Sequence, residues 1–299
     1  MRARVLKAAR QLGYRPNAIA RAMISGRSRL IAVLAAYLDN QFYPIVLEQL
    51  SRALQEKGYH VLLFMTETGR QDEVVQQMME YQVEGVVMAS ATLSSSLARE
   101  CAQTGIPVVL LNRYVPNSPA SSVTSDNVGG GELVAKLFVE TGHKRIAFIA
   151  GQEDSSTNKD REAGFVAGLA KENQKPWARA VGNYTFTGAT QAARFLLRGS
   201  ERPDAIFVAN DHMAFAVMDV IRNEFGLRIP ADISIVGFDN VPESGWGAYQ
   251  LTTIEQSSEL MVAETASLLI GQIESKSVSH RNVVLPAKLV LRQSCRTAP

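Results

Sequence analysis

The chain has 299 residues, of which 46% are hydrophobic and 20% charged, a composition typical of a globular protein of about two domains. It contains no apolar run long enough to cross a bilayer and no apolar segment of the secretory type near Met1. Its two cysteines, Cys101 and Cys295, show no metal-binding spacing and suggest no disulfide framework. We therefore expect a cytoplasmic protein with no membrane partner.

The charge is distributed unevenly along the chain. Eight of the 31 basic residues and none of the 29 acidic residues lie within residues 1–29, so the rest of the chain is net negative. A basic segment on an acidic body indicates that one end contacts a polyanion such as nucleic acid. A solvated basic tail would have the same composition and is the alternative interpretation.

The basic segment predicts two short helices. Residues 5–12 carry an apolar stripe of helical spacing, and Pro16 separates them from a second helix that is capped by Asn17 and covers 18–25. An isolated helix in water is marginal even at ~12–15 residues, so the second helix should order only against a partner. Basic side chains around the apolar Met23 suit a helix laid in a DNA minor groove, whereas a disordered linker is the alternative.

From Leu30 onward, apolar runs of strand length alternate with amphipathic segments of helical length. The runs are rich in Val, Ile, Leu and Phe throughout, as in strands buried on both faces of a parallel sheet. Strands are predicted at 30–35, 60–65, 85–89, 108–112, 146–150, 205–209 and 234–238. Helices are predicted at 43–57, 72–81, 95–104, 128–141, 159–172, 189–198, 213–224 and 258–273. A last strand-like segment covers 282–292, and the Pro/Ser-rich stretch 116–122 is a candidate domain boundary.

This alternation predicts doubly wound parallel sheets, which bind ligands at the carboxyl ends of their strands. Because the strands are too many for one ordinary sheet, we expect two such domains. Asn210 and Asp239 each follow a predicted strand and are candidates for ligand contacts, while Asp211 is expected to cap its helix. Arg161, near the start of a helix, can offer a fork of donors to hydroxyl pairs, carboxylates or phosphates.

Several segments match one known family in order and at similar spacing. The N-terminal match covers RVLKAARQLGYRPNAIARAM at 4–23 and SGRSRLIAV at 25–33. The later matches are GHKRIAFI at 142–149, REAGF at 161–165, PDAIFVANDHMA at 203–214, DISIVGFD at 232–239 and LTTI at 251–254. Together they span nearly the whole chain, which resembles the LacI/GalR family of bacterial transcriptional regulators.

The resemblance implies an α/β fold. It is a periplasmic-binding-protein-like type I core of two doubly wound parallel-sheet lobes, preceded by a remnant of an all-helical DNA-binding headpiece and a hinge helix. The implied domains are residues 1–29 for the remnant and hinge helix, 30–125 with about 254–284 for the N-lobe, and 126–253 with about 285–299 for the C-lobe. Relatives begin with two further helices, including the recognition helix, which contacts bases in the major groove. We therefore expect an N-terminally short headpiece, and the resemblance does not extend to residues that would contact the major groove.

The implied function is an effector-responsive, DNA-binding transcriptional regulator, a repressor that forms a homodimer. It would sense a small polar metabolite, most simply a sugar or sugar derivative, between its lobes. Lobe closure would then order or release the hinge helices, which contact the minor groove of operator DNA. The implied DNA-binding residues are Asn17, Ala20, Arg21, Met23 and Arg27, with Met23 as the wedge between bases.

The matched motifs also imply the effector site. Arg161, Asn210 and Asp239 occupy positions that bind the effector in relatives. Phe42 and Tyr184 are candidates for apolar walls, because the ring faces of a polyhydroxylated ligand need an apolar surface while its hydroxyls need polar partners. Further candidate contacts are Asp126, Ser90 and Gln256.

The sequence gives no sign of catalysis. The four histidines lack metal spacing, no nucleophile elbow is present, and the glycines at 129–131 lack the surrounding pattern of a phosphate-binding loop. We therefore expect no enzyme activity, no cofactor and no metal. The alternative function is a solute-binding protein of a transporter with the same core fold, which the basic segment and the lack of a secretory signal disfavour. An α/β enzyme using the same crevice is a third interpretation.

Overall fold

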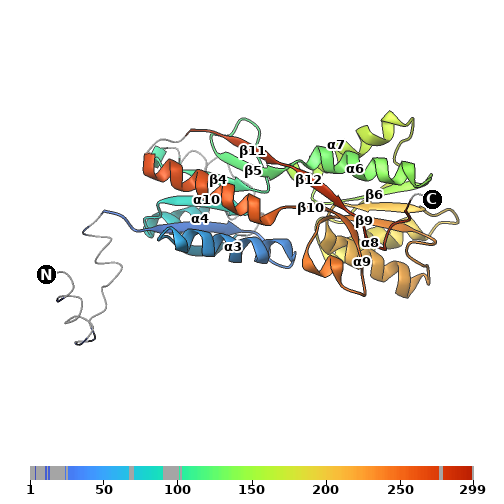
Figure 1. Ribbon diagram of the computed structural model, residues 1–299, viewed down its shortest axis with the longest axis horizontal. Helices are drawn as coiled ribbons and strands as arrows, with labels where there is room; N and C mark the ends of the chain where they lie inside the picture. Colours follow the sequence, from blue (N-terminus) through green and yellow to red (C-terminus); the bar gives the residue numbers. More distant parts are fainter. Residues whose placement is uncertain are drawn as a thin grey trace.

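The computed structural model describes residues 26–66, 71–89, 101, 103–275 and 279–297, together with Arg4, Gln11, Gly13 and Ile24. These residues form two α/β lobes arranged along the long axis of the molecule (Figure 1). In the described part of the chain, no helix combines the length and hydrophobicity needed to span a membrane. Some of the predicted site residues lie outside the described residues, namely Asn17, Ala20, Arg21, Met23 and Ser90.

The first lobe is built on a six-stranded parallel sheet in the order β11-β5-β4-β3-β1-β2. Its strands are β1 (Leu30–Ala35), β2 (His60–Met65), β3 (Gly85–Ala89), β4 (Val108–Leu111), β5 (Ser121–Ser125) and β11 (Asn282–Leu285). Its helices are α3 (Phe42–Glu56), α4 (Gln71–Glu80) and α10 (Ser258–Ser275). Helix α3 turns Val46, Leu50 and Leu54 into the core, which matches the apolar spacing of its sequence.

The second lobe repeats this architecture in the order β12-β10-β9-β8-β6-β7, with only β12 antiparallel to its neighbour among the described strand pairs. Its strands are β6 (Ile146–Ala150), β7 (Ala178–Val181), β8 (Ala205–Val208), β9 (Ser234–Asp239), β10 (Thr252–Gln256) and β12 (Ala287–Val290). Its α-helices are α6 (Asn127–Glu140), α7 (Ser156–Lys171), α8 (Phe186–Leu197) and α9 (Asp211–Asp219). Figure 1 shows α6 and α7 on one face of this sheet and α8 and α9 on the other.

Within the described residues, the chain passes between the lobes at three places. Asp126 connects β5 to α6, Ser257 connects β10 to α10, and Pro286 connects β11 to β12. The strand-like segment predicted at 282–292 is therefore two strands in two different sheets, divided at a proline that has no N–H to donate to a ladder. Ser121 and Ser122, which fell in the predicted boundary stretch, instead begin β5.

Three strands escaped the sequence prediction, β5 and β10 because their composition is polar and β7 because it has only four residues with an arginine among them. Strand β5 reads SSVTS, β7 reads ARAV and β10 reads TTIEQ. In β5 two of the buried hydroxyls have partners: Ser122 Oγ donates to Asn282 Oδ1 at 2.7 Å, and Ser121 Oγ accepts from Gln272 Nε2 at 2.9 Å. Satisfied hydrogen bonds allow a polar strand to lie between two layers of helix.

Candidate ligand-binding crevice

The carboxyl ends of strands from both sheets meet where the lobes join. Arg161, in the first half of α7, lies among the polar groups that the second lobe presents at this junction, and it is only 2% exposed. Its Nε donates to Asn127 Oδ1 at 2.8 Å and its Nη1 donates to the carbonyl of Ala209 at 2.6 Å. The guanidinium also lies over the Phe238 ring, 3.7 Å from its centroid. These contacts hold the planar group in one orientation while its Nη2 faces Asp239.

Asp239, at the end of β9, faces Arg161 from the same lobe. Its Oδ1 lies 3.7 Å from Arg161 Nη2 and accepts a hydrogen bond from Gln256 Nε2 at 2.6 Å. The residue has a left-handed φ of 136°, a strained conformation of the kind that clusters at binding sites. Burial raises the pKa of Asp239 to about 7, although Arg161 favours the ionised form.

Asn210 and Asp211 stand at the start of α9, and the residue that caps the helix is Asn210, whereas Asp211 was expected to do so. Asn210 caps α9, because its Oδ1 accepts the N–H of Met213 at 3.0 Å. Asp211 is buried instead, accepting a hydrogen bond from Thr253 Oγ1 at 2.6 Å and another from the N–H of Val241 at 3.1 Å. Burial raises the pKa of Asp211 to about 6. The prediction that Asp211 caps the helix is therefore wrong, and this carboxylate ties α9 to β9 and β10.

The first lobe supplies a wall that the sequence prediction missed. Arg113, just after β4, is 7% exposed and its Nη2 donates to the hydroxyl of Tyr37 at 3.2 Å. Burial raises the pKa of the nearby Tyr43, an effect that the charges of Arg113 and Arg161 oppose and that of Asp239 adds to. The position of Arg113 directly after a strand, as for Asn210, is the sequence signal that could have identified it.

The two predicted aromatic residues also lie at this junction. Phe42 is buried and contacts Tyr43 edge to face, with ring centroids 5.6 Å apart. Tyr184 has a left-handed φ of 59°, and its hydroxyl lies 3.1 Å from Thr157 Oγ1. Its ring lies so close over Gly151 that a Cβ at that position would clash with it. Glycine is thus required at residue 151 for the Tyr184 ring to adopt this position.

Several buried polar atoms around the crevice have no hydrogen-bond partner among the described residues. Asn210 Nδ2 is a free donor, since the cap fixes the other atom of this amide as the acceptor. Gln256 Oε1 is a free acceptor, since its amide nitrogen donates to Asp239. Further unpartnered atoms are Arg113 Nε, Asn112 Oδ1 and Asp239 Oδ2. An unsatisfied buried polar group costs ~1–3 kcal/mol, so such a set indicates a place for a ligand or water.

Direct contacts between the lobes close the crevice at its margins. Tyr114, from the loop after β4, donates its hydroxyl to Asp160 Oδ1 at 3.0 Å and its backbone N–H to Ser156 Oγ at 3.1 Å. On α9, His212 Nδ1 lies 3.3 Å from Gln41 Oε1 of the first lobe. A few polar contacts thus join the two lobes directly in this structure.

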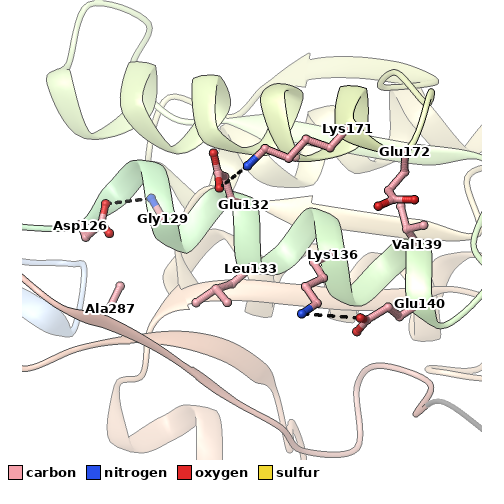
Figure 2. Close-up of a pocket in the computed structure, with 11 residues that line it drawn as sticks. Asp126, Gly129, Glu132, Leu133, Lys136, Val139, Glu140, Lys171, Glu172 and Ala287 are labelled. Atoms are coloured by element: carbon pink, nitrogen blue, oxygen red, sulfur yellow. Dashed lines mark hydrogen bonds and ion pairs between the residues drawn. The ribbon is translucent and has the colours of Figure 1, made fainter.

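Two other candidates lie apart from this cluster. Asp126 caps α6 by accepting the N–H of Gly129 at 2.8 Å, and it lines a hollow of about 520 Å³ beside α6 and α7 (Figure 2). In that hollow Lys171 pairs with Glu132. Arg27, the one described member of the predicted DNA contacts, pairs with Glu84 at 2.7 Å. Within the described residues, no group of three or more His, Cys, Asp or Glu side chains could hold a metal ion.

Comparisons with known proteins place this fold in a family. Residues 135–295 match a family described as periplasmic binding protein-like domain. The repressor PurR of Aliivibrio fischeri is 31% identical over 299 residues, covering 97% of this chain and 88% of that protein. A solved complex of the regulator CelR with cellobiose is 28% identical and superposes with a TM-score of 0.82, covering 97% of this chain and 89% of that chain.

The lac repressor dimer, solved bound to operator and the anti-inducer ONPF, superposes with a TM-score of 0.88 at 28% identity, covering 98% of this chain and 89% of that chain. These likenesses extend over both lobes and agree with the order of the sequence motifs. The chain belongs to the LacI/GalR family of transcriptional regulators and carries the two-lobed, periplasmic-binding-protein-like core of that family.

Proposed function

We propose that this transcriptional regulator is a repressor whose effector is an uncharged, polyhydroxylated small molecule, a free sugar or close derivative, held in the crevice between the lobes. Arg161, Asn210, Asp239 and Gln256 would bind its hydroxyls, together with Arg113. Phe42 and Tyr184 would cover its apolar faces, as aromatic side chains do in small-molecule sites. Ser90 stays a candidate contact outside the described residues.

The observation that carries this proposal is the mixture of unpartnered donors and acceptors in the crevice. A hydroxyl both donates and accepts, so a polyol can satisfy Asn210 Nδ2 and Gln256 Oε1 at once. A phosphate or carboxylate only accepts, and it would leave acceptors such as Gln256 Oε1 and Asn112 Oδ1 unsatisfied. The donor–acceptor balance therefore favours an uncharged ligand over an anionic one.

Relatives support the two halves of the proposed function. The CelR structure is a complex with cellobiose, and the lac repressor was solved as a dimer on operator. For this chain we propose operator binding in the minor groove through Asn17, Ala20, Arg21 and Met23, and action as a homodimer. The basic composition of residues 1–29 favours this function over that of a transport solute-binding protein, which would have no polyanion to contact.

A thermal-shift screen tests the ligand class. It would compare neutral pentoses, hexoses and disaccharides with sugar acids, sugar phosphates and nucleosides. A ligand at 100 times its Kd adds ~2.7 kcal/mol to the stability of the folded state, which is easily detected as a shift in Tm. We expect at least one neutral sugar to stabilise the protein. Stabilisation by nucleosides or sugar phosphates alone would overturn the proposed ligand class.

A further inference from the structure

The amino ends of three neighbouring strands in the first lobe hold the chain where it leaves the basic N-terminal segment. Strand β1 lies between β3 and β2, and the register places Leu30 beside His60 and Ile31 beside Gly85. The residues just before these strands, Arg29, Tyr59 and Glu84, therefore lie together. They lie at the outer end of the lobe, opposite the crevice, because parallel strands share their amino and carboxyl ends (Figure 1).

Glu84 contacts both the backbone and a side chain of this entering segment. Its Oε2 accepts from Arg27 Nη2 at 2.7 Å and from Arg27 Nε at 3.2 Å, while its Oε1 accepts the backbone N–H of Arg29 at 2.8 Å. The second Arg27 partner is the hydroxyl of Tyr59, which accepts from Nη2 at 2.9 Å. The Glu84 side chain is 14% exposed and that of Arg27 37%, so solvent screens this pair only in part.

Two further contacts fix the segment 27–29 to the lobe. Ser28 Oγ donates to the carbonyl of Gln82 at 2.6 Å, and the Arg29 guanidinium lies 5.0 Å from the centroid of the Tyr59 ring. Arg29 has a left-handed φ of 57°, a strained conformation that persists only where surrounding contacts impose it. The segment 27–29 is thus bound to the lobe by both its backbone and its side chains.

We propose that Glu84 is a positioning residue, which anchors the base of the DNA-contacting segment to the first lobe so that movement of the lobe is passed to that segment. Arg27 then acts as the anchored group and not as a phosphate contact. The same β1 strand ends at the crevice, six residues, or ~20 Å, from the anchor, and buried strands transmit displacement with little deformation. The link to DNA rests on the proposed function, whereas the anchor itself does not.

Two variants separate the anchor from general effects of charge. Glu84→Gln removes the carboxylate that holds Arg27 and Arg29. Glu48→Gln is the matched control, since it removes an exposed ion pair with Arg52 on α3 of the same lobe. The first readout is the rate of trypsin cleavage after Arg27, measured by the appearance of a fragment that begins at Ser28. This rate reports the anchor without any ligand or DNA, because trypsin binds the arginine side chain and the Arg27 guanidinium must first separate from Glu84. We expect cleavage at least threefold faster in Glu84→Gln than in the control.

The second readout is the effect of a sugar on DNA binding, expressed as the ratio of the DNA Kd with the sugar to the DNA Kd without it. The sugar is one that stabilises the wild type, and the DNA is a fragment that the wild type selects from a random library. We expect Glu84→Gln to reduce this ratio at least threefold while leaving the sugar Kd unchanged. Equal trypsin rates in Glu84→Gln and the control, or an unchanged ratio, would overturn the proposal. If the ratio for the wild type equals one, the proposed function fails, and the trypsin rates alone then test whether Glu84 anchors the segment.

A third variant distinguishes the anchor from a phosphate contact by Arg27. Each lost phosphate contact lowers the slope of log K against log salt by about 0.9 for duplex DNA. We expect Arg27→Met to leave this slope unchanged and to increase trypsin cleavage after Arg29. A slope lower by about one would show that Arg27 contacts DNA, and would overturn its assignment as the anchored group.

Discussion

At the residue scale, one side chain can have both a structural and a ligand-facing atom, and Asn210 is the clearest case. Its Oδ1 caps α9, and its Nδ2 is left without a partner in the crevice. Arg161 is similar, since Asn127 and the Ala209 carbonyl fix its guanidinium while one nitrogen faces Asp239. Preorganised side chains of this kind bind a ligand without first having to order themselves.

Asn210→Asp tests the free donor of Asn210 while keeping the cap. The carboxylate can still accept the N–H of Met213, but it presents an acceptor to the crevice where a donor stood. We expect the affinity for a neutral sugar to fall at least about fivefold, since such a contact is worth ~1–3 kcal/mol, with little change in Tm. Calorimetric titration measures this effect. Asn223→Asp, on an exposed position of the second lobe, is the control, and equal affinities in the two variants would remove Asn210 from the site.

Asp239 predicts a pH dependence in the ligand-free protein. Burial raises its pKa from 3.8 to about 7, so the folded state holds a proton that the unfolded state has lost. Its contribution to stability is therefore fully present below pH 3.8 and disappears as the pH rises through about 7. We expect Asp239→Asn to gain on the order of 1–3 kcal/mol relative to wild type between pH 5 and pH 8, measured by urea unfolding. A pH-independent difference between the two proteins would contradict the raised pKa.

Part of the site could be predicted from single residues. Arg161, Asn210, Asp239 and Gln256 could be proposed from the sequence because each lies in or near a recognisable motif, and the structure brings them together. Arg113 follows β4 as Asn210 follows β8, but the sequence does not say that this end of β4, or the start of α3 with Tyr43, faces the second lobe. Their role depends on how two sheets meet, and that is a property of tertiary packing and not of local pattern.

At the element scale, the crevice is closed by contacts between loops and helix starts. Tyr114, after β4, reaches Ser156 and Asp160 at the start of α7. Helix α7 is also the element that carries Arg161, so the contacts between the lobes and the proposed ligand contact involve the same helix. Bridges of this kind set the population of the closed, binding-competent state, and the apparent affinity is reduced when that population falls.

Tyr114→Phe removes the hydroxyl bridge to Asp160 and leaves the backbone contact to Ser156. Because the closed state loses one hydrogen bond worth ~0.5–1.5 kcal/mol, we expect sugar affinity to weaken by about two- to tenfold. Small-angle X-ray scattering of the ligand-free variant should also show a larger radius of gyration. Tyr81→Phe, an exposed tyrosine of the first lobe, should change neither quantity. Wild-type affinity and radius in Tyr114→Phe would show that the bridge does not control closure.

Elements with continuous apolar runs could be predicted, whereas those stabilised by side-chain hydrogen bonds could not. Strands such as β1 and β6 are apolar throughout and agree with their predicted bounds. The polar β5 was missed because its burial depends on Asn282 and Gln272, which come from the far end of the chain. The division between β11 and β12 was missed for a related reason, since a single proline separates two strands that otherwise read as one.

At the scale of the whole molecule, the edge of the first sheet predicts a dimer. Strand β2 is an edge strand of that sheet, and its side chains Leu63 and Met65 are 48% and 51% exposed. Exposed apolar side chains clustered on an edge strand are typical of an interface, and a second copy of the chain is the proposed occupant.

Met65→Glu tests this interface by placing a charge on the apolar edge. Sedimentation velocity at micromolar concentration should show a dimer for the wild type and a monomer for the variant, because a buried unpaired charge is costly. The control is Val284→Glu on β11, the opposite edge of the same sheet, where Val284 is 63% exposed. A variant that dimerises as well as the wild type would move the interface elsewhere.

Together these proposals require that the binding of a neutral sugar in the crevice and of DNA at the basic segment be thermodynamically linked through the first lobe. Linkage is reciprocal, so DNA must change the sugar affinity by the same factor by which the sugar changes the DNA affinity. The direct measurement is a calorimetric titration of the sugar into the wild-type chain, free and saturated with its selected DNA fragment. We expect the two sugar Kd values to differ at least fivefold, by the same factor by which the sugar changes DNA binding. A sugar Kd that is the same in the presence and absence of DNA would contradict it.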